Sequence, residues 1–310
     1  MIGAATSSRY VFCAVRRLEP KYVGYLPLKR QVRGIEQVYG PKRDLLLLDN
    51  NVLASDHFED IIRDIVELGF ERGAKAEGKL RRLDFNQGID ARRLAKKHVQ
   101  LLSQTALSPM RLAFDSIAMR DQYIRCVRMC CDYGLTRHST YVLYNYTDTP
   151  RDFYERMRIG VLLNEELGAK ISSFPMKYIP LDAKNRRFVG KNWSRKLIRG
   201  VQCILLATRG MVSPRREFFD AAFGRTPEEF IQIAMMPEPY IIYRRKHELN
   251  GASDWLSLYK HLSTSQRRRL FEVVGKGRVG PTEVARESSL RLKRILAHYA
   301  DSAAEEAPNS

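Results

Sequence analysis

The sequence predicts an α/β fold in which parallel strands and helices form a partial barrel, followed by a basic α-helical extension. Through the first half of the chain, short apolar runs alternate with longer amphipathic segments. This alternation is typical of βα units whose parallel strands are buried on both faces. The glycine-rich phosphate-binding turns of Rossmann and Walker-type proteins are missing. Their absence favours a partial (β/α)6 barrel, similar to a TIM barrel, over an open doubly wound sheet.

Six segments are expected to form the strands of this barrel. They are short and rich in apolar and aromatic residues, as strands in a buried sheet usually are. They span residues 11–15, 44–49, 83–86, 111–114, 140–144 and 171–174.

Capping residues mark the helices between the strands. Asp56 followed by Glu59 predicts one helix start, and Thr149 followed by Asp152 predicts another. The reason is that an oxygen ahead of the first turn accepts hydrogen bonds from the free N–H groups there. Further helix starts are expected at Asp90, Arg120 and Ser263.

The charge pattern divides the chain into regions. Residues 184–294 carry 24 Lys and Arg against 10 Asp and Glu, whereas residues 1–150 carry 24 against 17. Most of the basic excess therefore follows the barrel. We expect a barrel over 1–183, a basic extension packed on it over 184–250, a helical segment over 251–300 and a flexible tail over 301–310.

The composition limits the class of protein. With 53 Lys and Arg against 35 Asp and Glu, the formal net charge is +18, so anionic partners are expected. Five cysteines are an odd number in a chain long enough to form a core without disulfides, which argues against a secreted disulfide scaffold. No secretory signal and no apolar run of about 18 residues is found. A cytoplasmic protein with no membrane partner is predicted.

Polar residues follow five of the expected strands. In a barrel the active site lies at the carboxyl ends of the strands, so these residues are candidates for binding or catalysis. They are Asp49-Asn50-Asn51, Asn86-Gln87-Gly88, Asp115-Ser116, Asn145 and Pro175-Met176.

Several of these motifs resemble those of the radical S-adenosylmethionine enzymes, over roughly residues 5 to 190. The resemblance begins at Phe12-Cys13-Ala14-Val15. It continues through Gly40-Pro41-x-x-Asp44, Leu45–Asn51, Asp84–Asp90, Ala113-Phe114-Asp115, Tyr144–Pro150 and Ser172–Met176. It implies a partial barrel that cleaves S-adenosylmethionine to a 5′-deoxyadenosyl radical, which then attacks a substrate that the sequence does not identify.

The resemblance also implies a four-iron four-sulfur cluster, held by the motif Cys-x3-Cys-x2-Cys. Thiolates are soft ligands that suit iron–sulfur clusters. Cys13 takes the place of the third ligand, but Tyr10 and Thr6 stand where the second and first would be. Two of the three ligands are therefore missing, and whether the chain is an enzyme stays open.

Three accounts of this departure remain open. The beginning of the coding sequence has been replaced or cut, or the chain is a degenerate member that keeps the barrel for binding, or the ligand set is unusual. An active form would also need an electron donor as a partner.

S-adenosylmethionine is the second cofactor that the resemblance implies. Asp49, Asn50 and Asn51 take the place of a Gly-Gly-Glu run that meets the methionine amino group in many members. A carboxylate followed by amides can accept hydrogen bonds from an ammonium group. By the same analogy, Gln87, Asp115 and Asn145 would face the ribose, the adenine or the substrate.

The remaining cysteines and one histidine are predicted to be structural residues. Cys126, Cys130 and Cys131 lie in one expected helix, where they are predicted to pack against the sheet, and Cys203 is predicted to lie in the core. His138 precedes the fifth strand, so it is expected at the amino-terminal face of the barrel, where residues serve stability.

The basic third of the chain supports a rival function, which is non-catalytic binding of nucleic acid. Clusters of Arg and Lys could neutralise phosphates, with Trp193, Trp255 and Tyr259 nearby in sequence for base stacking. The clusters are Arg215-Arg216, Arg244-Arg245-Lys246, Arg267-Arg268-Arg269 and Arg291-x-Lys293-Arg294.

Overall fold

The computed structural model describes residues 17, 27–48, 51–242, 248–277 and 279–305. The chain divides into two compact units. Unit 1 contains residues 1–143 and 156–184, and unit 2 contains residues 144–155 and 185–310. The segment 144–155, which we expected within the barrel, thus belongs with the helices that follow.

Unit 1 is a mixed α/β structure, as the alternating pattern predicted. Its strands are β1 (Asp44–Leu47), β2 (Lys75–Ala76), β3 (Lys79–Leu80), β4 (Arg82–Phe85), β5 (Met110–Ala113), β6 (Arg137–Tyr144) and β7 (Lys170–Lys177). Its helices are α2 (Leu28–Tyr39), α3 (Phe58–Glu67), α4 (Lys96–Leu102), α5 (Arg120–Asp132) and α6 (Pro150–Leu167), with short 3-10 turns at Val52–Ala54 and Ile117–Met119. The last residue of β6, Tyr144, and residues 150–155 of α6 belong to unit 2.

Five of the six expected strands are present, and the sixth, over 11–15, lies outside the described residues. They form small sheets and no closed barrel within the described part of the chain. β1 pairs with β4 in parallel, β2 pairs with β3, and β5, β6 and β7 form a three-stranded sheet in that order. Between β4 and β5 the ladder is reduced to isolated bridges, Leu83 with Leu107 and Ile89 with Leu112.

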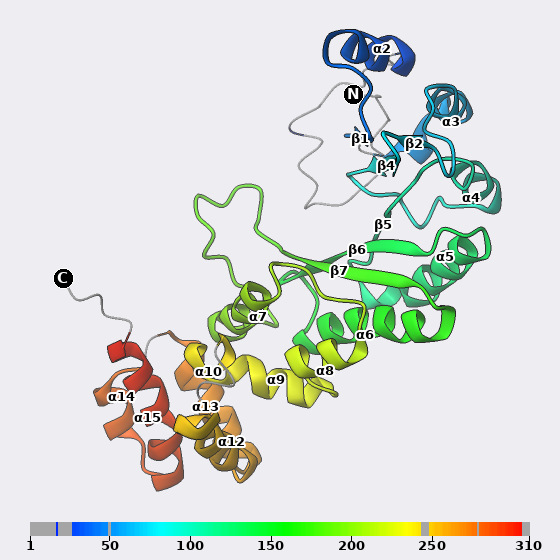
Figure 1. Cartoon of the computed structure of the whole chain (residues 1–310). Helices are drawn as coiled ribbons and strands as arrows, with labels where there is room; N and C mark the ends of the chain where they lie inside the picture. Colours follow the sequence, from blue (N-terminus) through cyan, green and yellow to red (C-terminus); the bar gives the residue numbers. More distant parts are fainter. Residues whose placement is uncertain (1–16, 18–26, 49–50, 243–247, 278, 306–310) are drawn as a thin grey trace. The chain divides into compact units, whose positions relative to one another are not determined.

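Helices cover one face of these strands. Figure 1 shows α5 and α6 running along the same side of β6 and β7. On this side the alternate strand residues Leu83, Leu112 and Ile171 join one core with residues of the helices. Those helix residues include Ile61, Ile65, Val99, Val127, Ile159 and Leu163. On the opposite face Leu46, Leu48, Phe174 and Met176 are exposed, whereas Ser139 and Leu143 of β6 are buried. The expectation that the strands are buried on both faces is therefore wrong for the described parts of β1 and β7.

The predicted helix starts are confirmed in part. Thr149 accepts from the N–H of Asp152 at 3.1 Å, and Asp152 accepts from the N–H of Thr149 at 3.0 Å. Asp56 is not a cap, because α3 begins at Phe58 and its N-cap residue, His57, makes no side-chain cap bond. Asp90 bonds to the N–H of Arg92 at 3.0 Å in the turn before α4 rather than capping that helix.

The cysteines and His138 of unit 1 lie under the helices. Cys126 and Cys130 are buried, and the Cys126 thiol donates to the carbonyl of Ala91 at 3.2 Å. His138 is also buried, with its Nε2 atom 3.7 Å from the sulfur of Cys131. The predicted packing role is confirmed for Cys126 and Cys130, whereas Cys131 is only partly buried.

Unit 2 is helical. It contains α7 (Arg195–Ala207), α8 (Arg216–Phe223), α9 (Pro227–Met235), α10 (Glu238–Ile242), a π-helical turn (Glu248–Ala252), α12 (Ser253–Lys260), α13 (Thr264–Gly275), α14 (Pro281–Arg286) and α15 (Leu290–Glu305). The predicted capping pair of Ser263 and Gln266 opens α13. An aromatic core of Tyr154, Phe219, Phe223 and Phe230 fills the space between α8, α9 and the segment before residue 156. Cys203 lies in α7 and is buried, as predicted. Within the described residues, no helix combines the length and the apolar character that crossing a bilayer requires.

Candidate functional site

The face of the sheet that the helices leave uncovered is the candidate functional site of unit 1. Successive side chains of a strand point to opposite faces, so the residues that alternate with the core residues lie here. We call this surface the open face. From β1 to β7 it carries Leu46, Leu48, Asp84, Asn86, Arg111, Ala113, Asp115, Ser139, Tyr141, Leu143, Ser172, Phe174 and Met176, of which Ser139 and Leu143 are buried.

An ion pair joins β4 to β5 on the open face. The guanidinium of Arg111 donates to both carboxylate oxygens of Asp84, each at 2.6 Å. Both side chains are about one fifth exposed, so water screens the pair only in part. The hydrogen bonds to Asp84 raise the pKa of Arg111. Bidentate pairs of this kind fix geometry as well as charge, and this one holds adjacent strands together where the ladder is interrupted.

Two aromatic side chains lie beside this pair. The ring of Tyr141 lies 5.8 Å from the Arg111 guanidinium and 5.8 Å from the ring of Phe174. The Tyr141 hydroxyl donates to the carbonyl of Asn86 at 2.7 Å. Burial raises the pKa of Tyr141, so the phenol stays protonated at neutral pH. Gly88 lies beside the Tyr141 ring, and its φ of +85° is a backbone conformation that favours glycine.

Large apolar side chains on the open face are accessible. Leu46 is 53% exposed, Leu48 49%, Met176 40% and Phe174 38%. Leu46 and Leu48 belong to the β1 end of the strands, and Phe174 and Met176 belong to β7, so the four side chains form two separate pairs. Exposed apolar side chains beside charged groups are a feature of binding surfaces. The open face therefore has the mixture of apolar and polar groups that a small amphipathic ligand requires.

Only some of the site residues predicted from the sequence lie at the strand ends beside the open face. Asp115 lies at the end of β5 and accepts from the N–H of Leu143 at 3.3 Å. Gln87 lies in the turn after β4 and is exposed. Asn51 precedes the turn after β1, and its side-chain oxygen is buried without a hydrogen-bond partner among the described residues. Asp49, Asn50 and Cys13 lie outside the described residues.

Asn145 belongs to unit 2, where it holds a loop. Its backbone φ is +68°, a conformation that Asn adopts more readily than most residues. Its side-chain oxygen accepts from the N–H of Gly190 at 2.7 Å, and its side-chain nitrogen donates to the carbonyl of Phe188 at 3.2 Å. A Cβ at Gly190 would lie 2.8 Å from the Asn145 carbonyl oxygen. The amide group thus serves loop structure.

The described residues do not fit a metal cluster. No three His, Cys, Asp or Glu side chains among them are grouped to hold a metal ion. Burial raises the pKa of Cys126, Cys130 and Cys131, and it raises the pKa of Cys203 to about 11. Burial thus favours the neutral thiol form of these four cysteines.

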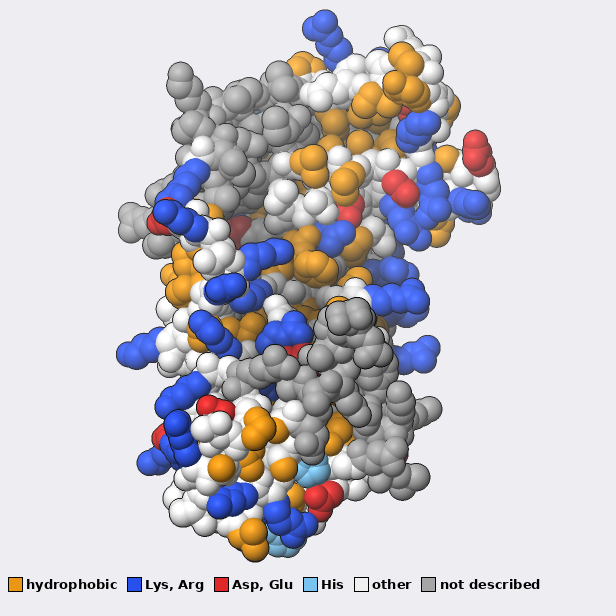
Figure 2. Space-filling model, turned by 90° about the vertical axis from the view of Figure 1, so that its left-hand side faces the viewer, with side chains coloured by type: hydrophobic (Ala, Val, Ile, Leu, Met, Phe, Trp, Pro, Cys, Tyr) orange, Lys and Arg blue, Asp and Glu red, His pale blue; other side chains and the backbone are white. Residues whose placement is uncertain are grey.

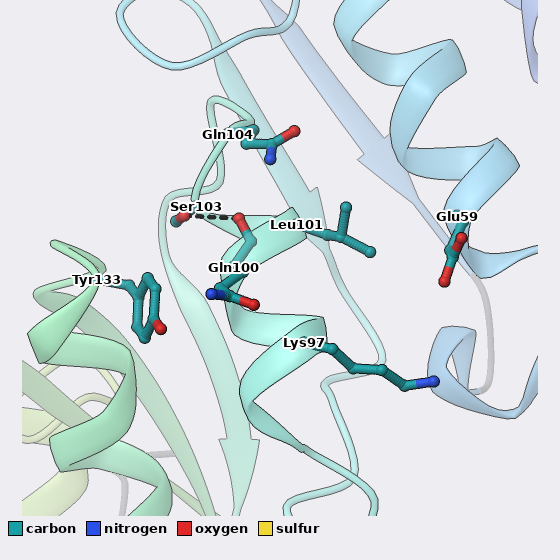
Figure 3. A pocket seen from close by; sticks show the side chains of 7 residues that line it. All are labelled: Glu59, Lys97, Gln100, Leu101, Ser103, Gln104 and Tyr133. Atoms are coloured by element: carbon teal, nitrogen blue, oxygen red, sulfur yellow. Dashed lines mark hydrogen bonds between the residues drawn. The ribbon is translucent and has the colours of Figure 1, made fainter.

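A shallow depression lies on the helical side of unit 1. Its volume is about 520 Å³, and it is lined by Glu59, Lys97, Gln100, Leu101, Ser103, Gln104 and Tyr133. Figure 3 shows these side chains coming from α3, α4 and the turn after α5. Ser103 bonds to the carbonyl of Gln100 at 2.7 Å, within its own helix end. The depression contains none of the predicted site residues and no converging buried polar groups, so the open face is the better candidate.

The aromatic residues predicted for base stacking are not available in unit 2. Trp255 is fully buried, Tyr259 is 6% exposed and Trp193 is 7% exposed, so their predicted role as a stacking surface is wrong. Several of the clustered arginines have partners: Arg216 pairs with Asp220 and Arg294 with Asp254. The cluster at 244–246 lies outside the described residues.

Sequence reasoning missed the central residues of the open face, which are Asp84, Arg111, Tyr141 and Phe174. A usable signal existed in Arg111, because a cation in the middle of an apolar strand is not buried without an acidic partner. Alternation then places Asp84, two residues before Asn86, on the same face as the predicted strand ends.

Comparison with models of known protein families finds no match for this chain, and comparison with curated proteins finds none either.

Proposed function

We propose that unit 1 is a partial barrel of the radical S-adenosylmethionine type and that its open face binds S-adenosylmethionine and a substrate. The observation that carries this proposal is the pairing of exposed apolar side chains with the Asp84–Arg111 ion pair on the uncovered face of parallel strands. In barrels built from such strands, binding occurs at the carboxyl ends. The motifs that resemble the family supply the identity of the ligand.

The chemistry of the ligand matches the groups on this face. Adenine is a flat aromatic ring, and Phe174 and Met176, which lie two residues apart on β7 and are both exposed, offer it contact area. The ammonium and hydroxyl groups need hydrogen-bond acceptors, which Asn51 and Gln87 would supply at the strand ends. No radical step is assigned to the described residues, because the ligand-motif positions Thr6, Tyr10 and Cys13 lie outside them.

Replacing Phe174 by Asp is expected to weaken binding of S-adenosylmethionine at least about tenfold, a loss of about 1.4 kcal/mol. The substitution removes apolar contact area and adds a charge, yet Phe174 is exposed enough for the fold to tolerate it. Equilibrium dialysis of the full chain with radiolabelled S-adenosylmethionine measures the affinity.

Leu162→Asp provides the matched control. Leu162 is 44% exposed and lies on α6, on the helical side of unit 1, so the same chemical change there should leave the affinity within about twofold. Equal losses in both variants, or no binding by the unmodified chain, would contradict the proposal.

Nucleic-acid binding by the basic third is a second candidate, favoured by charge. Figure 2 shows Lys and Arg side chains spread over the drawn face with few Asp and Glu between them. With the aromatic residues buried, such binding would rest on phosphate contacts. The logarithm of the association constant for a labelled single strand should then fall linearly with the logarithm of salt concentration, by about 0.7 per contact. Fluorescence anisotropy measures this slope, and absence of binding at low salt would rule the candidate out.

A further inference from the structure

Cationic side chains gather at the amino-terminal edge of the sheet in unit 1, at the opposite end of the strands from the predicted site residues. Arg43 immediately precedes β1, Arg82 opens β4 and Arg137 opens β6. Because β1 and β4 are parallel, and β5 and β6 are parallel, the starts of each pair meet at one edge. The fold therefore brings together charges that lie far apart in the sequence.

These side chains line a pocket. Its volume is about 360 Å³, and its lining residues are Arg43, Lys79, Leu80, Arg81, Arg82, Ser108 and Arg137. Five of these seven residues are cations, and none is acidic. Leu80 comes from the short hairpin of β2 and β3, and it supplies an exposed apolar wall.

Two of the cations are held in place by the fold. The Arg81 guanidinium donates to the carbonyl of Leu68 at 3.0 Å and lies 4.4 Å from the ring of Phe70. Arg43 donates to the carbonyl of Leu80 at 3.2 Å and lies 3.5 Å from the carboxylate of Asp44. These contacts fix two guanidinium groups at the pocket wall.

Arg43 has the carboxylate of Asp44 nearby, and Arg81 lies 3.9 Å from the carboxylate of Glu36. The other three cations of the pocket have no such ion pair among the described residues. Lys79, Arg82 and Arg137 are exposed, and no carboxylate among the described residues pairs with their side chains. At the amino-terminal face of a barrel, residues usually serve stability. A cluster of like charges does not, because like charges repel one another in the folded state. A bound anion would remove that repulsion.

We propose that this pocket binds a small ligand carrying a polyphosphate group. Guanidinium groups match phosphate oxygens in geometry and charge, since their planar forks donate two parallel hydrogen bonds. Ser108 adds a hydroxyl donor at the same wall. The five cations converge on one pocket, which suits a polyphosphate group, whose charges lie on a few neighbouring atoms. A nucleic-acid strand instead needs cations spaced along its length.

Tripolyphosphate is the probe that tests the pocket. Isothermal titration calorimetry of the full chain at low salt should show binding, and the double variant Arg82→Gln with Arg137→Gln should weaken it at least about tenfold. Neither side chain has a hydrogen-bond or ion-pair partner among the residues that the structure describes, so the double variant should keep or raise the melting temperature of the ligand-free protein. Added tripolyphosphate should raise the melting temperature of the unmodified chain but not of the double variant.

The control is the double variant Arg120→Gln with Arg125→Gln. Both arginines are exposed on α5 and have no ion-pair partner among the described residues, so the change in net charge is the same. Affinity within about twofold of the unmodified chain supports a local site. Equal weakening in both double variants would show a general charge effect and overturn the proposal, as would no binding at all. A short oligonucleotide that binds through Arg82 and Arg137 where tripolyphosphate does not would also overturn it.

Discussion

Replacing Arg156 by Met is expected to lower the free energy of unfolding of unit 1 by about 3 kcal/mol. Arg156 lies on α6 and is 1% exposed. One of its terminal nitrogens donates to the carbonyls of Phe114 and Leu143, each at 2.8 Å. These carbonyls lie at the ends of β5 and within β6, so Met would leave two buried acceptors without a donor. Each such loss costs on the order of 1–3 kcal/mol.

The measurement exploits the position of the tryptophans. Trp193 and Trp255 are the two tryptophans of the chain, and both belong to unit 2. Tryptophan fluorescence therefore follows unit 2 during urea unfolding, whereas far-ultraviolet circular dichroism follows both units. We expect Arg156→Met to lower the urea concentration at which unit 1 unfolds, as seen by circular dichroism. The unfolding transition of unit 2, as seen by tryptophan fluorescence, should stay where it is.

Arg151→Met is the control on the same helix, at a position that belongs to unit 2. Arg151 is 59% exposed and pairs with Glu228, and exposed pairs of this kind contribute about 0–1 kcal/mol. If Arg156→Met destabilises the protein no more than Arg151→Met does, the two carbonyl contacts are not important for the fold.

Replacing His138 by Leu is expected to remove much of the acid sensitivity of unit 1. Burial lowers the pKa of His138 from 6.5 to about 4. Between these two pH values the unfolded chain binds a proton that the folded chain does not, so stability is lost as the pH falls from 6.5 towards 4. The full effect is about 3 kcal/mol, and it is absent above pH 6.5.

The melting temperature recorded from pH 7 to pH 4 measures this effect. The His138→Leu variant should lose less stability over this range than the unmodified chain. His57→Gln, which replaces an exposed histidine of the same unit, is measured alongside as the control for the loss of an imidazole group. If the melting temperature of His138→Leu falls with pH as steeply as that of the unmodified chain, His138 is not the source of the acid sensitivity.

The strands of unit 1 were predictable because each has a local signature. The apolar runs around Leu46, Leu83 and Leu112 lie within β1, β4 and β5, and the capping pair of Thr149 and Asp152 opens α6 as expected. Whether helices cover the second face of the sheet could not be predicted. A short apolar run in the sequence looks the same when helices pack on one face of its strand and when they pack on both.

The functional residues were harder to predict because their arrangement depends on pairing between distant segments. Asp84 and Arg111 are 27 residues apart in sequence, and only the neighbouring placement of β4 and β5 brings them together. Asn145 shows the opposite case. Its position after a strand suggested a ligand contact, but its amide group bonds to residues 188 and 190, which no local pattern indicates.

Hydrogen–deuterium exchange of the full chain, with and without saturating S-adenosylmethionine, tests most directly whether the open face is the binding site. We expect slower exchange in the turns that follow β4 and β5, at residues 86–90 and 114–119, because bound ligand restricts opening of the backbone there. Exchange in the helices of unit 2 should stay the same. Slower exchange confined to unit 2, or no change anywhere at a concentration that saturates binding, would contradict the account.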